Sequence, residues 1–153
     1  MIRALAIACV LAGISLSACG GTQTPAEALN AWTSSTQLAN AVTALLTDSR
    51  AVHDAITMHR DAKVIRTVCA ELLLDAQGAN DSLPTPDGQL TGLLSSAYGE
   101  LAAAASRCYG AATLPAKLEA ADARRSRAIG SLVAGVLRAE AVLGRPIHVA
   151  GIP

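Results

Sequence analysis

The side chains best suited to chemistry in this chain of 153 residues are its four cysteines and three histidines. His53, Met58 and His59 lie close together in the sequence, and imidazole and thioether groups are ligands for copper and haem iron. Residues six apart lie about 240° apart around a helix, so His53 and His59 do not face one ligand. We therefore expect solvated histidines, with no metal site and no cofactor, and keep metal or haem binding through His53/Met58/His59 as the alternative function.

Motifs of common enzymes are missing from the sequence. We find no Gly-x-Ser-x-Gly, Ser-x-x-Lys or His-Glu-x-x-His pattern and no glycine-rich phosphate loop. Asp75, Asp81 and Asp87 carry oxygen ligands that suit calcium, but the EF-hand spacing is absent, so we expect helix caps and turn formers. The sequence predicts no catalytic residue and a protein that is not an enzyme.

A cysteine near the start follows a short apolar segment. Arg3 precedes the apolar run 4–17, which is too short for a comfortable transmembrane helix and has about the length of a signal peptide. The run ends in Leu16-Ser17-Ala18-Cys19, with a leucine three residues before the cysteine and small residues between them. This segment resembles the lipobox of bacterial lipoproteins. The Ala-rich chain behind it, with its single cysteine pair, resembles the uncharacterised lipoproteins of high-GC Gram-positive bacteria.

The resemblance implies a lipid-anchored protein. Residues 1–18 would be a signal peptide that is removed, and the thiol of Cys19 would receive a diacylglycerol group. A further acyl chain, such as palmitate, would then modify its amine. Two acyl chains give stable anchoring, so we expect the mature chain at the extracytoplasmic face of the cell membrane, with residues 19–25 as a polar tether. The alternative is a plain secreted protein in which Cys19 is incidental.

The resemblance to lipoproteins also implies a separate role for each of the four cysteines. Cys9 would leave with the signal peptide and Cys19 would be lipidated, which leaves Cys69 and Cys108 as a pair in an oxidising compartment. Such a pair predicts a disulfide. Two buried free thiols are the alternative.

Composition favours helices and excludes one class of partner. Loss of residues 1–18 would remove Arg3 and leave 11 basic against 12 acidic residues. The sequence has no basic patch of the kind that binds nucleic acid, so we expect no nucleic-acid partner. The chain has no Phe, and Ala and Leu, which dominate it, are strong helix formers.

Apolar residues recur at helical spacing in four segments between residues 26 and 144. The first segment carries the stripe Leu38, Val42, Leu45, Ser49, Val52 and Ile56. A second set comprises Ile65, Val68, Cys69, Leu72 and Leu73, and a third Leu90, Leu94, Ala97, Leu101, Ala104 and Cys108. The last stripe is Leu118, Ala121, Arg125, Ala128, Leu132, Val136, Ala139 and Leu143.

These segments predict an all-α, antiparallel up-down four-helix bundle. An unbroken helix over residues 26–77 would be about 78 Å long, so we expect a break within 58–63. The alternative is three helices with a long bent first helix. Residues 145–153 are predicted to form an extended or frayed tail.

One residue conflicts with the last stripe. Arg125 falls among apolar side chains, and we expect it to snorkel out or to pair with Glu71 or Glu100. The other arginines of this segment indicate either a salt-bridged surface or contact with anionic lipids. The predicted function is that of a non-catalytic helical binding or interaction module at the cell envelope, with a protein or an apolar ligand as partner.

Overall fold

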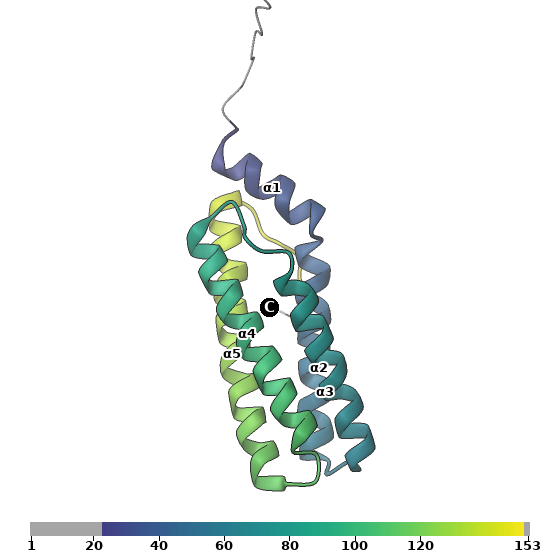
Figure 1. The fold of residues 1–153 in the computed structure, drawn as a ribbon. Helices are drawn as coiled ribbons and strands as arrows, with labels where there is room; N and C mark the ends of the chain where they lie inside the picture. The colour runs from purple at the N-terminus through teal and green to yellow at the C-terminus, as the bar shows by residue number, and fades with distance from the viewer. Residues whose placement is uncertain (1–22, 152–153) are drawn as a thin grey trace, which may run out of the picture.

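The structure, a computed structural model, describes residues 23–151 and contains five α-helices and no strand in that range (Figure 1). The helices are α1 (Pro25–Ser35), α2 (Leu38–Thr57), α3 (Ala62–Asn80), α4 (Gly88–Gly110) and α5 (Pro115–Leu143). The all-α class is confirmed, but the predictions of four or three helices are wrong. Residues 1–22 and 152–153 are not described, so the signal peptide and Cys19 lie outside the described residues.

The four long helices run side by side, and α1 crosses one end of them (Figure 1). Each of α2, α3 and α4 packs on the helix that follows it, and α5 packs back on α2 to close the ring. The connections alternate between the two ends, because α2–α3 and α4–α5 turn at the end away from α1. The predicted bundle is therefore present, with a fifth helix across it.

The extra helix arises from a break at Thr36 and Gln37, where one continuous helix was predicted. Four consecutive residues that lead into the break, 33–36, have hydroxyl side chains, and each hydroxyl donates to a backbone carbonyl three or four residues earlier. Thr33 and Ser34 donate to Asn30, and Ser35 and Thr36 donate to Trp32. Such local bonds compete with the helical ladder. Gln37 then adopts a left-handed φ of 50°, which turns the chain before α2 begins.

Burial holds α1 on the bundle. Leu29 is fully buried, and the indole Nε1 of Trp32 donates a hydrogen bond of 3.1 Å to the carbonyl of Ser82 in the α3–α4 connection. Arg145, just beyond α5, donates to the side-chain oxygen of Asn30. These contacts hold α1 against the α3–α4 connection and the segment after α5.

The predicted break before α3 is confirmed at residues 58–61. His59 has a left-handed φ of 49°, and the Asp61 carboxylate caps α3 by accepting from the backbone N–H groups of Lys63 and Val64. Helix α3 then continues to Asn80, three residues past its expected end. The start of α4 agrees with prediction, since Asp87 caps it by accepting from Leu90 N.

Leucine and alanine side chains fill the core, together with Tyr98. All six residues of the predicted α2 stripe are buried, and so are all six of the α4 stripe.

The structure joins Cys69 of α3 to Cys108 of α4, as predicted. Their Cα atoms lie 6.0 Å apart, within the range for a disulfide, and both side chains are buried. A cross-link over a sequence separation of 39 residues stabilises the fold by about 4 kcal/mol in the chain-entropy model.

The prediction for the C-terminal segment was an extended or frayed tail, and the structure corrects it in one respect: residues 145–151 are non-helical but packed rather than frayed. Val149 is buried, and Ile147 packs on the core. Ala150 N donates to Thr43 Oγ1, and Arg50 donates to the carbonyl of Gly151 at 3.3 Å. The segment therefore runs back along α2 after Gly144 ends α5 with a left-handed φ of 66°.

Helices α4 and α5 pack tightly at a glycine of α5. A Cβ on Gly135 would lie 2.7 Å from Leu94 Cδ2, and Leu94 is itself buried. Gly130, on the same helix, has no atom within 4 Å of its Cβ position.

This pair of glycines makes a matched test of the close approach. Overpacking costs about 1–3 kcal/mol, whereas Gly to Ala in a helix gains about 1 kcal/mol. We expect Gly135→Ala to lower the free energy of unfolding in urea and Gly130→Ala to raise it by about 0.5–1 kcal/mol. Equal stabilisation by both substitutions would contradict the close packing at Gly135.

Candidate functional site

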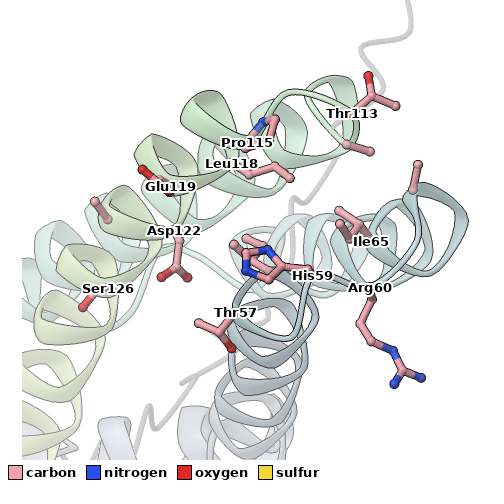
Figure 2. A pocket seen from close by; sticks show the side chains of 14 residues that line it. Thr57, His59, Arg60, Ile65, Thr113, Pro115, Leu118, Glu119, Asp122 and Ser126 are labelled. Atoms are coloured by element: carbon pink, nitrogen blue, oxygen red, sulfur yellow. The ribbon is translucent and has the colours of Figure 1, made fainter.

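A cavity of about 840 Å³ opens at the end of the bundle away from α1. It lies where the α2–α3 turn faces the α4–α5 connection and the start of α5 (Figure 2). The lining residues are Ile56, Thr57, His59, Arg60, Ala62, Ile65, Ala112, Thr113, Pro115, Leu118, Glu119, Asp122, Ala123 and Ser126. We refer to this site as the distal cavity.

The distal cavity combines an apolar floor with a few polar groups. Ile56, Ile65, Ala112 and Leu118 are buried and line its inner part. Figure 2 shows the ring of His59 and the carboxylate of Asp122 coming from opposite sides, the turn and α5, while the Arg60 side chain points away. An apolar pocket with a small number of polar groups is typical of a site for a small ligand.

The carboxylate of Asp122 is a polar group of the cavity that two neighbouring side chains fix in place. Its carboxylate accepts a 2.7 Å hydrogen bond from Arg125 Nε and lies 3.0 Å from His53 Nδ1 of α2. Burial acts to raise the pKa of Asp122, but the hydrogen bonds and charges of Arg125 and His53 outweigh it and leave the pKa below the usual value. The cavity therefore contains a carboxylate that is ionised at neutral pH.

The same contacts correct the prediction for Arg125. Its partner is Asp122, one turn earlier on the same helix, and neither Glu71 nor Glu100. The i, i+3 spacing of Asp122 and Arg125 was visible in the sequence and is a known helix pairing. The sequence did not show that His53 of α2 would join them.

The three residues of the alternative metal or haem function do not form one site. His53 bonds to Asp122, Met58 is 65% exposed and His59 lines the distal cavity. Across residues 23–151, no three His, Cys, Asp or Glu side chains are placed to hold a metal ion.

The same part of the chain contains no catalytic arrangement that we can identify. Within residues 23–151 the only hydrogen bond to a histidine ring is that between His53 and Asp122. No hydroxyl or thiol in this range is therefore paired with a histidine base, as nucleophilic catalysis by such a pair would require.

Two further arginines of α5 are paired across helices. Arg124 forms an ion pair with Glu100 of α4, and Arg138 donates to Asp87 at 2.6 Å. Hydrogen bonds from Arg138 and Leu90 lower the pKa of Asp87. These pairs agree with the interpretation of a salt-bridged surface.

The acidic residues around the α3–α4 connection take separate roles. Asp87 caps α4 and Asp81 ends α3, as expected for caps. Asp75 instead faces Asp48 of α2, and their carboxyl groups share a hydrogen bond. Burial raises the pKa of Asp48 to about 6, and the bond to Asp75 and the charges of Asp75 and Glu71 add to the effect.

The Asp48–Asp75 pair predicts a pH dependence of stability. The folded state holds the proton of Asp48 more tightly than the unfolded chain, where the pKa is near 3.8. Stability should therefore fall as the pH rises from about 4 through about 6. We expect Asp48→Asn to remove this decline, measured as the melting temperature against pH. Asp54→Asn, on the same helix, serves as the control, and an unchanged decline in Asp48→Asn would exclude this origin.

Comparison with known proteins assigns no family to this chain: no protein-family model, no curated protein and no solved structure matches it. Of the helices between residues 23 and 151, none is both long enough and apolar enough to cross a membrane.

Proposed function

We propose that this chain is a lipid-anchored protein of the cell envelope whose helical domain binds a small ligand in the distal cavity. The ligand has an apolar body, which packs on the buried Ile56, Ile65 and Leu118, and a polar group, which meets Asp122 and His59. The observation that carries the proposal is the cavity itself, whose volume of about 840 Å³ lies within the range of known ligand sites.

The position of the cavity supports a role for a tethered protein. The chain enters the domain at Pro25, at the end capped by α1, and the cavity opens at the opposite end (Figure 1). The 20 residues of α2 separate the two ends by about 30 Å. An anchor at Cys19 would therefore leave the cavity facing away from the membrane, where a ligand enters from solution.

The anchor is tested by removing the thiol that would be lipidated. We expect Cys19→Ala to move the protein from the membrane fraction to the soluble fraction of cells, because the thioether to diacylglycerol cannot form. Cys9→Ala is the matched control and should stay in the membrane fraction. Membrane retention of Cys19→Ala, together with an unmodified Cys19 in the wild type, would contradict the anchor.

The cavity is tested with a substitution that fills it. Ala123 is exposed and lines the distal cavity, so we expect Ala123→Trp to weaken binding of N-phenyl-1-naphthylamine, an uncharged apolar fluorescent probe, by at least about tenfold. Ala141→Trp places the same side chain at an exposed position near the other end of α5 and should bind as the wild type does.

Native mass spectrometry of protein extracted from membranes provides the second measurement. We expect a retained small molecule on the wild type and on Ala141→Trp, and its loss from Ala123→Trp. A wild type that retains no molecule and does not bind the probe would contradict the proposed function, whatever the outcome for the anchor.

A further inference from the structure

A second hollow lies on the long side of the bundle, in the seam between α2 and α5. It has a volume of about 390 Å³ and is lined by Leu46, Ser49 and Arg50 of α2, by Arg125, Ile129, Val133 and Leu137 of α5, and by Gly151. We call it the α2–α5 groove. It is separate from the distal cavity, with which it shares no lining residue.

The groove has one apolar wall. Ile129, Val133 and Leu137 recur every four residues on α5, and Leu137 is 56% exposed although it is a large apolar side chain. Leu46 faces them from α2 and is itself buried. From Arg125 to Leu137 the wall extends about 18 Å at the rise of an α-helix, which suits a linear hydrocarbon chain.

The polar groups of the groove gather at one end of this wall. The contact of His53 with Asp122 sets the register of α2 against α5. Because the helices run in opposite directions, Arg50, three residues before His53, lies at the same level as Arg125, three residues after Asp122. Among the described residues no Asp or Glu lines the groove. The Asp122 carboxylate behind it balances the charge of Arg125, so the charge of Arg50 leaves this end with an excess of positive charge.

The donors at this end are incompletely used. Arg125 gives Nε to Asp122, and Arg50 makes one long bond, 3.3 Å, to the carbonyl of Gly151. Beside them Ser49 is 2% exposed, and its Oγ is the one buried side-chain polar atom without a hydrogen-bond partner in the described residues. A buried hydroxyl without a partner is costly, and an acceptor bound in the groove beside Ser49 would remove that cost.

We infer that the α2–α5 groove binds an amphiphile with one acyl chain and an anionic headgroup, a carboxylate or a phosphate. The chain lies along Ile129, Val133 and Leu137. The headgroup accepts charge-assisted hydrogen bonds from Arg50 and Arg125 and a hydrogen bond from the Ser49 hydroxyl. A cationic amphiphile is repelled by the two arginines. This site goes beyond the proposed function, since it uses neither the distal cavity nor the anchor.

The site is tested on the full chain in its own membranes with a diazirine derivative of lauric acid. After illumination and digestion with trypsin, we expect the label on the peptide 128–138, which carries the apolar wall. Arg50→Gln should raise the half-saturating concentration of the probe by about tenfold or more, since it removes a charge-assisted bond. Arg66→Gln removes one exposed charge from α3, outside the groove, and should label as the wild type does.

Competition identifies the headgroup. If laurate competes with the probe and dodecyl phosphate does not, the headgroup is a carboxylate, and the reverse result assigns a phosphate. Dodecanol alone or inorganic phosphate alone should compete weakly. Val133→Trp fills the groove without changing its charge and should abolish the label. This second variant keeps the test valid if Arg50→Gln does not fold. Labelling confined to peptides that contain no lining residue of the groove, or dodecanol competing as well as laurate, would overturn the inference. Ala123→Trp should leave this label unchanged, so failure of one site is distinguishable from failure of the other.

Discussion

The small size of the core side chains is the constraint on which the rest of this structure depends. Without Phe, and with Tyr98 as the one fully buried aromatic side chain in the described residues, the helices must lie close together to exclude water. At Gly135 the approach leaves no room for a methyl group beside Leu94. The disulfide between Cys69 and Cys108 spans two helices that are close for the same reason.

Close packing is not distributed evenly around the bundle, and both proposed sites lie where it is weakest. Helices α4 and α5 pack extensively, whereas α2 and α5 have much less contact. The seam between α2 and α5 is partly covered by the C-terminal segment and partly open as the α2–α5 groove. At the end away from α1 none of the described helices lies across the bundle, and the distal cavity is open there (Figure 1).

Asp122 connects these two regions. It lies in the wall of the distal cavity, bonds across the seam to His53 and holds Arg125, which lines the α2–α5 groove. An ionised carboxylate beside a largely buried guanidinium stabilises both groups only while the two remain paired. The charge of Arg125, which appeared out of place in an apolar stripe, is accommodated by this pair.

Local patterns in the sequence determined the helical class, the stripes of α2 and α4 and the cap at Asp87, because periodicity and capping act within a few residues. The break after Thr57 was expected because an unbroken helix would be too long for the domain. The four consecutive Ser and Thr residues 33–36 were also a sequence signal for the break after α1, although periodicity alone predicted one helix. The cysteine pair followed from the resemblance of the first 19 residues to lipoprotein signals. Only the tertiary structure decided that His53 of α2 joins the Asp122–Arg125 pair across the seam, how residues 145–151 pack along α2 and where both hollows lie. These features depend on which helices lie side by side and on how closely they pack. Local sequence patterns do not specify the distance between residues that are far apart in the chain.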